Sequence, residues 1–239
     1  MRLLIVRHAD PDYAGNTITP AGHLEALALA RRMAAIRPDR LYCSPLGRAI
    51  HTAQYTADAL HLPLNIEGWT QELGTALSAT PPNWGSQGGR LMAWDVPGEV
   101  IRAHDPLPTA GDWSAREPFT DPSFRAAFEE LQKNSDAFLA RHGYVREDHR
   151  YRIAAANREK IAVFCHGGFG LTWLAHLLDI PLTLVWSGFW LAPSSITTVL
   201  FDERSAEWAT PRVIGAADTS HLYEAGLPIQ HHGIKANTD

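Results

Sequence analysis

The sequence predicts an α/β fold, in which helices on both faces cover a central, largely parallel sheet. Short apolar runs alternate along the chain with longer helical patterns, and such alternation is typical of three-layer α/β/α domains. Three helical patterns begin with a capping residue followed by proline, which marks a helix start. With 239 residues, of which 45% are hydrophobic, the chain is long enough to bury one sizeable core.

The expected strands are short apolar segments rich in residues that favour extended backbone. They lie at residues 2–6, 40–43, 62–66, 161–165 and 196–201. Because each is followed by a helical pattern or by turn residues, most of them should pair in parallel.

The expected helices follow from their start signals and from apolar periodicity. Thr19-Pro20 predicts a helix that ends near Ile36, Ser44-Pro45 one that ends near Leu60, and Asp121-Pro122 one that ends near His142. A fourth helix is expected at residues 169–178, where apolar side chains recur at helical spacing.

Residues 75–118 interrupt this rhythm with proline, glycine and the three tryptophans Trp84, Trp94 and Trp113. The stretch is long for a structureless loop in a compact domain, and its aromatic residues argue against disorder. We therefore expect one domain over residues 1–239, with a cap-like insert at about 75–157 over the active site. The tryptophans could stack on a nucleotide, sugar or aromatic ligand, but tryptophans in an insert are more often packing anchors. The end of the chain after Pro228 is expected to fray.

Composition excludes several classes of function. The formal net charge is −5 and the pI is near 6.2, so a general nucleic-acid or membrane-surface binder is not expected. The absence of a long apolar run and the presence of only two cysteines, Cys43 and Cys165, predict a cytoplasmic protein. The sequence leaves the oligomeric state open, with a homodimer among the options.

Two predicted strands end on histidines that a strand alone does not explain. Arg7 and His8 follow the first apolar run, and His166 follows the run at 161–165. In open α/β sheets, ligands bind beyond the carboxyl ends of the strands. An imidazole beside a guanidinium suits phosphoryl chemistry, because the imidazole can attack phosphorus while the arginine holds the oxygens.

A third strand, at 40–43, is followed by Ser44 and Arg48 at the start of a helix. A helix N-terminus offers free N–H groups and a positive dipole end, and Arg48 adds a bidentate fork. Taken alone, Arg48 would be a solvated surface arginine. Together, these three strand ends can place two histidines and two arginines around one anion.

These segments resemble the histidine phosphatase superfamily, the phosphoglycerate mutase-like group. The resemblance rests on Leu4-Ile5-Val6-Arg7-His8, Thr19-Pro20-Ala21-Gly22, Ser44-Pro45-Leu46-Gly47-Arg48-Ala49 with the following Ile50-His51-Thr52-Ala53, and Val163-Phe164-Cys165-His166-Gly167. They stand in the family's order and spacing and cover roughly residues 1–75 and 160–200. The block that begins at Ser44 is the most specific of them.

The resemblance implies a phosphoglycerate mutase-like fold and a site whose catalytic residues are His8, Glu72 and His166. His8 would accept the phosphoryl group, and Arg7, Arg48 and His166 would bind it. Glu72 would protonate the leaving oxygen, with Glu67 as a second candidate for this role. Asn16 would be a further phosphate contact, although its spacing from His8 is longer than in the family. No metal ion and no cofactor are required by this chemistry.

Two residues depart from the family pattern: Ala9 replaces the glycine that usually follows the nucleophile, and Asp10 replaces a glutamate. Alanine is a small change, but Asp10 near the pocket could repel anionic substrates. Among other enzyme classes, a cysteine phosphatase needs five residues between cysteine and arginine, and Cys43 and Arg48 are separated by four. A metallohydrolase using His8, Asp10 and His166 lacks a ligand motif.

The sequence therefore favours a metal-independent phosphomonoester hydrolase that forms a phosphohistidine and acts on a small phosphomonoester. A cofactor-dependent phosphoglycerate mutase-type phosphotransferase is an alternative. Mutases in the family resemble one another in an arginine-histidine-tyrosine run after the acid, whereas Glu72 is followed by Leu73-Gly74-Thr75. A non-catalytic protein that binds phosphorylated ligands is the alternative from another class. The natural substrate is not encoded in any motif that we recognise.

Overall fold

The computed structural model describes residues 1–77, 80–81, 84 and 91–234. In this part of the chain, an eight-stranded sheet runs through the molecule in the order β5-β4-β10-β1-β11-β12-β9-β8. The strands are β1 (Arg2–Arg7), β4 (Arg40–Cys43), β5 (Leu64–Ile66), β8 (Tyr144–Glu147), β9 (Arg150–Ile153), β10 (Lys160–Cys165), β11 (Ile196–Asp202) and β12 (Trp208–Asp218).

The sheet has a parallel part and an antiparallel part. Strands β5, β4, β10 and β1 pair in parallel, and β11, β12, β9 and β8 continue the sheet in antiparallel pairs. The predicted α/β fold with a largely parallel central sheet is confirmed. The hairpin β8–β9 and strand β12 were not expected from the sequence.

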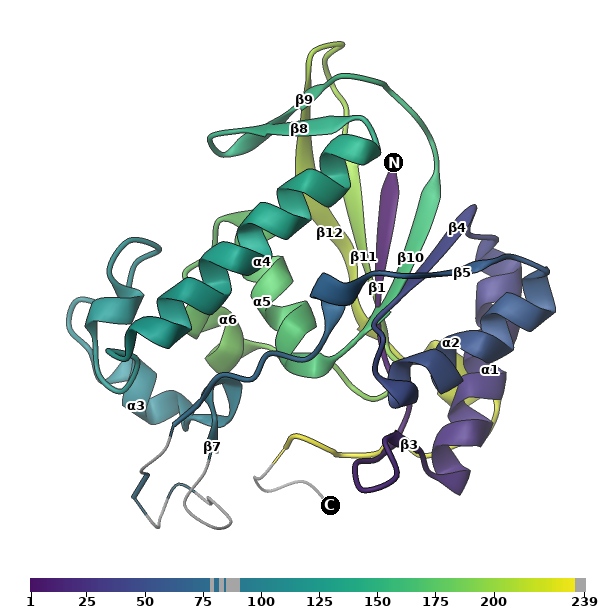
Figure 1. Ribbon diagram of the computed structural model, residues 1–239, viewed down its shortest axis with the longest axis horizontal. Helices are drawn as coiled ribbons and strands as arrows, with labels where there is room; N and C mark the ends of the chain where they lie inside the picture. The colour runs from purple at the N-terminus through teal and green to yellow at the C-terminus, as the bar shows by residue number, and fades with distance from the viewer. Residues whose placement is uncertain (78–79, 82–83, 85–90, 235–239) are drawn as a thin grey trace.

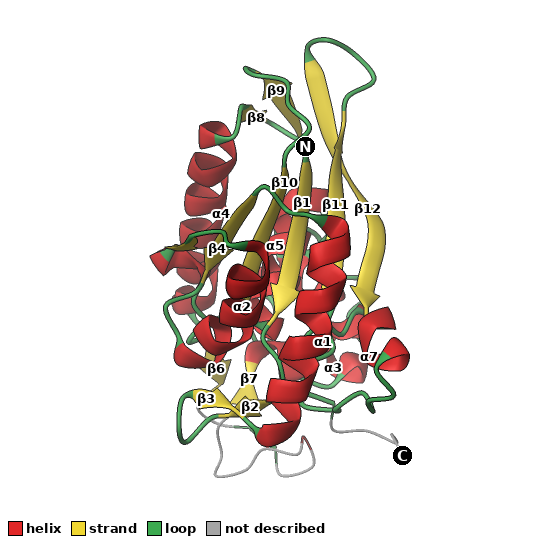
Figure 2. Cartoon of the chain, turned by 90° about the vertical axis from the view of Figure 1, so that its right-hand side faces the viewer, coloured by secondary structure: helices red, strands yellow, loops and turns green. Residues whose placement is uncertain are grey.

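Helices cover both faces of the sheet, which gives the three layers (Figure 2). Helices α1 (Pro20–Ile36), α2 (Gly47–Leu60) and α7 (Ser220–Glu224) lie on one face. The other face carries α4 (Pro122–Arg141), α5 (Gly167–Leu178) and α6 (Leu182–Gly188), with the short α3 (Gly98–Arg102) against α6 (Figure 1).

Alternation along β1 divides the core between these two layers. Leu3 and Ile5 belong to the large apolar cluster that includes Phe169 and Trp173 of α5. Their neighbours Leu4 and Val6 belong to a second cluster with residues of α1 and α2. Since successive side chains of a strand point to opposite faces, one buried strand holds both helical layers.

The predicted helix starts are confirmed where a side chain caps the helix. The hydroxyl of Thr19 accepts a hydrogen bond from the Gly22 N–H at the start of α1, and Asp121 accepts one from Ser123 at the start of α4. Helix α2, by contrast, begins at Gly47 rather than after Ser44, and its N-cap Leu46 makes no side-chain cap. Helix α5 begins two residues earlier than expected.

The range expected as an insert contains two kinds of structure. Residues 122–153 form α4 and the hairpin β8–β9, which pack on the main sheet and extend it. Before them lie the small sheet β6 (Ala76–Leu77) with β7 (Leu91–Met92) and the helix α3. Another small sheet, β2 (Pro11–Asp12) with β3 (Thr17–Ile18), follows β1. No helix in the described residues is long and apolar enough to cross a membrane.

Candidate active site

The predicted site residues meet at the carboxyl ends of the neighbouring strands β4, β10 and β1. Arg7 pairs with Cys165 in the register of β1 and β10, and Cys43 of β4 pairs with Phe164. The next residues along these strands are therefore brought together. The ring centroids of His8 and His166 lie 5.2 Å apart.

His8 is buried, and its tautomer is fixed by the backbone. Its Nδ1 lies 2.7 Å from the carbonyl oxygen of Ala9. A carbonyl can only accept, so Nδ1 carries the proton and the lone pair is on Nε2. Burial, with Arg7 and His166 as further causes, lowers the pKa of His8 well below its ordinary value. The imidazole is therefore neutral near pH 7, which is the form that can act as a nucleophile.

Two main-chain carbonyl oxygens orient the guanidinium of Arg7. Its Nη1 donates to the carbonyl of Leu191 at 2.5 Å and to that of His232 at 3.1 Å. The guanidinium is buried, and these contacts fix its orientation at the end of β1. Neither acceptor has a signal in the sequence, because both lie more than 180 residues away along the chain.

Arg48 stands in the first turn of α2, where it is half-buried. Its guanidinium carbon lies 5.4 Å from the ring centroid of Tyr13, an exposed residue of the loop between β2 and β3. Such a contact between a guanidinium and an aromatic face orients the arginine. The sequence analysis did not identify Tyr13.

His166 is fully buried, and Ser44 sets its orientation. The serine Oγ lies 2.8 Å from His166 Nε2 and also accepts the N–H of Leu46. If the hydroxyl donates to Nε2, the free Nδ1 carries a proton and is a donor. Burial, with Arg48 and Arg7 as further causes, lowers the pKa of His166 well below its ordinary value. Ser44, expected as a helix cap, is thus a partner of His166.

Three polar atoms of this group have no hydrogen-bond partner in the described structure. They are Nε of Arg7, Nε of Arg48 and Nδ1 of His166, all of them buried. A buried donor without a partner costs about 1–3 kcal/mol. Their convergence beside His8 is the signature of a site that is completed by an anion with several acceptor oxygens.

Glu72 joins the group from the segment that follows the 3-10 turn Gly68–Thr70. Its carboxylate accepts the N–H groups of Gly168 and Phe169 at 3.2 and 2.7 Å, so it lies at the N-terminus of α5. Burial raises its pKa above the ordinary value, although these hydrogen bonds act in the opposite direction. Raised pKa values of this kind are found in carboxylic acids that donate protons.

Glu67, the second candidate for the acid, is engaged elsewhere. Its two oxygens bind Arg141 at 2.7 Å and the indole N–H of Trp69 at 2.9 Å. The geometry therefore favours Glu72.

Asn16 lies close to the start of α2 but makes no hydrogen bond with the described histidines or arginines of the site. A Cβ on Gly47 would fall 2.1 Å from the carbonyl oxygen of Asn16, so glycine is required where the loop meets the helix. Asn16 itself has a positive φ of 49°, which asparagine tolerates better than most residues. A direct role in phosphate binding stays a prediction.

Trp94, from the expected insert, covers the start of α5. A Cβ on Gly168 would meet the Trp94 ring at 2.4 Å. The indole thus lies against the backbone that binds Glu72 and supplies an apolar roof there. Trp113, by contrast, is fully buried among Phe119, Phe128 and Trp186, as expected of a packing anchor.

The cysteine phosphatase alternative finds no support in the geometry. Cys43 and Cys165 are fully buried, and burial raises the pKa of both thiols, whereas a nucleophilic cysteine needs a lowered one. Across the described residues, no three His, Cys, Asp or Glu side chains are grouped so that they could hold a metal ion.

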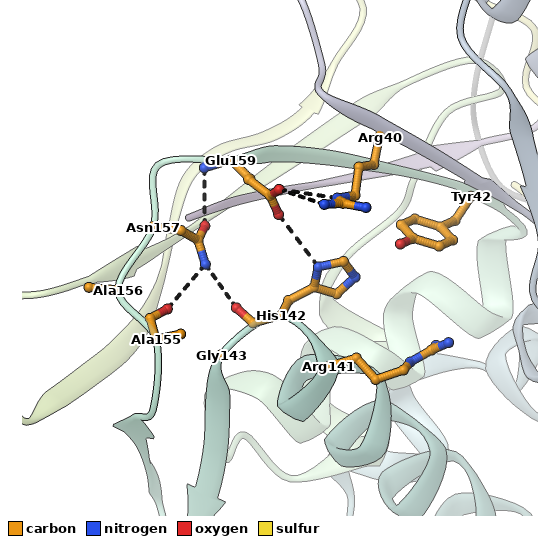
Figure 3. A pocket seen from close by; sticks show the side chains of 9 residues that line it. All are labelled: Arg40, Tyr42, Arg141, His142, Gly143, Ala155, Ala156, Asn157 and Glu159. Carbon is orange, nitrogen blue, oxygen red and sulfur yellow. Dashed lines mark hydrogen bonds and ion pairs between the residues drawn. The ribbon is translucent and has the colours of Figure 1, made fainter.

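A cavity of about 390 Å³ lies at the amino ends of β4 and β10, away from these residues (Figure 3). Its arginines already have carboxylate partners: Arg40 binds Glu159 at 3.0 Å, and Arg141 binds Glu67. Of its described lining residues, His142 has one buried ring nitrogen, Nε2, without a hydrogen-bond partner, whereas three such atoms on three side chains mark the histidine site.

Residues 3–75 match the model of the histidine phosphatase superfamily (branch 1). This range contains Arg7, His8, Arg48 and Glu72. No curated protein matches the chain.

Solved structures with the same fold include three phosphatases. Phosphoserine phosphatase from Entamoeba histolytica, solved with 3-phosphoglyceric acid, has a TM-score of 0.60 at 18% identity over 92% of this chain and 98% of its own. Mycobacterial glucosyl-3-phosphoglycerate phosphatase has a TM-score of 0.57 at 17% identity, with the same coverage. Alpha-ribazole phosphatase from Shigella flexneri has a TM-score of 0.56 at 18% identity, over 92% of this chain and 97% of its own.

Proposed function

Because the chain carries the histidine phosphatase superfamily pattern over residues 3–75, we propose that this protein is a phosphomonoester hydrolase that works through a phosphohistidine on His8. The observation that carries the proposal is the group of unpartnered donors on Arg7, Arg48 and His166 beside a neutral imidazole. A phosphoryl group supplies the acceptors that these atoms lack.

In the first step, Nε2 of His8 attacks phosphorus in line with the leaving oxygen. The Ala9 carbonyl holds the proton on Nδ1, so the lone pair needs no prior deprotonation. The phosphorus–oxygen bond of the ester breaks and a phosphorus–nitrogen bond forms. Attack by water on this intermediate then releases inorganic phosphate and restores His8.

Arg7, Arg48 and His166 stabilise the charge on the transferring group. Their donors are held in place by Leu191, Tyr13 and Ser44 before the substrate arrives. Preorganised donors of this kind stabilise a transition state because they need no reorganisation during the reaction. This provides the positive charge that metal ions supply in kinases.

Glu72 is the proton donor to the leaving alkoxide and then the base that activates water. Its raised pKa keeps it protonated to a higher pH than an ordinary glutamate. The three phosphatases of similar fold support hydrolysis over a mutase reaction.

The proposal is tested by His8→Ala and by trapping the intermediate. His8→Ala should lower turnover of p-nitrophenyl phosphate by roughly 10³-fold or more and leave the circular dichroism spectrum unchanged. Rapid quenching of the wild-type reaction should yield acid-labile phosphate on His8. Substantial turnover by folded His8→Ala protein would refute the nucleophile. Loss of wild-type activity in EDTA, restored by a divalent ion, would instead support a metallohydrolase.

A further inference from the structure

The segment near the C-terminus, residues 231–234, lies against the phosphate pocket instead of fraying away from it. The carbonyl oxygen of His232 accepts hydrogen bonds from Arg7 Nη1 at 3.1 Å and from the indole of Trp190 at 3.3 Å. Its imidazole Nδ1 lies 2.5 Å from Oδ1 of Asp10. One residue therefore contacts both an arginine of the site and an acid beside it.

Asp10 is the residue whose charge needs compensation. It lies two positions after the nucleophile, and its side chain is 7% exposed. Its Oδ2 accepts the hydroxyl of Thr19, and its backbone N–H donates to Glu25, a second buried acid. In the described part of the chain, His232 is the basic side chain within ion-pair distance of Asp10. An uncompensated carboxylate here would repel a phosphate dianion, and burial leaves that repulsion poorly screened.

We propose that His232 is a positioning residue that prepares the pocket for dianionic phosphate. Its carbonyl fixes one nitrogen of Arg7, and its imidazole, which counters the negative charge of Asp10 when it is protonated, lies 2.5 Å from that carboxylate. The proposal rests on the proposed function of the site, and it adds a residue that the superfamily match over residues 3–75 does not contain.

The charge of Asp10 acts on bound substrate and on the transition state in a similar way. When the His232 imidazole is removed, the charge of Asp10 is left without an ion-pair partner. This should change KM more than kcat, because an interaction that acts equally on bound substrate and transition state alters only binding. The imidazole is 45% exposed, which limits the size of the effect. A change in affinity of about fivefold is expected, within the range of exposed and partly buried ion pairs.

The test compares His232→Ala with wild type, using the full chain, an alkyl phosphate as substrate and inorganic phosphate as ligand. In His232→Ala, KM and the Kd for inorganic phosphate should both rise about fivefold, with kcat within twofold. Adding Asp10→Asn should restore both constants, because no charge is left to compensate. His231→Ala, whose ring faces Trp190, is the matched control and should resemble wild type.

Each other outcome overturns the proposal. Unchanged KM and Kd in His232→Ala, in an enzyme that hydrolyses phosphomonoesters, would refute the role of His232 and leave the proposed function intact. A loss that Asp10→Asn does not restore would show a structural effect instead. If wild type does not turn over, the Kd for phosphate still decides, and absence of phosphate binding refutes both proposals.

Discussion

At the scale of single residues, the site depends on protonation states that the surroundings impose. His8 is kept neutral by burial and by its cationic neighbours, and Glu72 is biased toward its protonated form by burial. The pKa of His8 is therefore lowered and the pKa of Glu72 is raised, relative to their ordinary values. Such a pair can hold a base and an acid at the same pH, which a two-step phosphoryl transfer requires.

The role of Glu72 can be separated from a structural one by the leaving group. Glu72→Gln keeps one acceptor oxygen, so it can accept only one of the Gly168 and Phe169 N–H groups, which use separate carboxylate oxygens, and it cannot donate the catalytic proton. Hydrolysis of an alkyl phosphate should fall by about 10²-fold or more, and hydrolysis of p-nitrophenyl phosphate far less, because its leaving group departs as an anion. Glu67→Gln is the control. Equal losses on both substrates would argue against Glu72 as the acid.

Arg48 should act through the shape of its guanidinium as well as its charge. Arg48→Lys keeps the charge and loses the fork and the contact with Tyr13. We expect kcat/KM to fall by an amount equivalent to about 2–4 kcal/mol of transition-state stabilisation. Steady-state kinetics on p-nitrophenyl phosphate measure this, and wild-type values would place Arg48 outside the pocket in solution.

At the scale of secondary-structure elements, local signals could be predicted from sequence and distant ones could not. Helix α1 begins at Pro20 as expected, because Thr19 and Pro20 are themselves the cap and first turn. Helix α2 begins later than expected because Ser44 bonds His166, a partner 122 residues away. Strand β12 contains Pro211 and Gly215, which conceal it, and it is stabilised by pairing with β11 and β9.

The same distinction applies to the site. The side chains that follow strands β1, β4 and β10 could be predicted, since parallel strands present their carboxyl ends at one edge. Tyr13 and His232 could not, because a loop and the tail bring them there through tertiary contacts. Trp94 lies in the insert expected over the site, but its contact with Gly168 could not be predicted. Their residue types carry no pattern that separates them from other exposed or packing residues.

The start of helix α5 and the Trp94 ring that covers it should be energetically coupled through Gly168. Gly168→Ala places a methyl group within 2.4 Å of the Trp94 ring, so the indole must shift, at a cost of about 1–3 kcal/mol in unfolding free energy. Urea unfolding and KM should both report the change. Gly74→Ala, whose added Cβ meets nothing within 4 Å, is the control. In a Trp94→Ala background, Gly168→Ala should cost little unfolding free energy, because the clash with the indole is gone. Additive losses in the double variant would contradict the predicted coupling.

At the scale of the whole molecule, buried polar groups of other elements hydrogen-bond to the residues around the site and affect the stability of the fold. Glu25 of α1 is buried and accepts the N–H of Asp10. Burial raises its pKa from an ordinary 4.5 to about 7. Stability therefore depends on the protonation of a residue that takes no part in the proposed chemistry.

The direction of this dependence follows from linkage. Between pH 4.5 and about 7, the folded protein binds the Glu25 proton more tightly than the unfolded chain, so this residue lowers the unfolding free energy as pH rises. The full effect is on the order of 3 kcal/mol. Glu25→Gln should remove that slope and be more stable than wild type at pH 8. Urea denaturation at several pH values measures the unfolding free energy. If the unfolding free energy of Glu25→Gln depends on pH in the same way as that of wild type, the attribution to Glu25 is refuted.

The burial of Cys43 and Cys165 has a consequence for handling and for redox conditions. Oxidants and alkylating reagents act on thiolates that solvent can reach, and these sulfurs are enclosed, with raised pKa values. The proposed phosphomonoester hydrolysis by the folded protein should persist in iodoacetamide, in dilute peroxide and without added reductant. Peroxide that inactivates phosphatases with a nucleophilic cysteine should not affect the proposed reaction, because the proposed nucleophile is an imidazole.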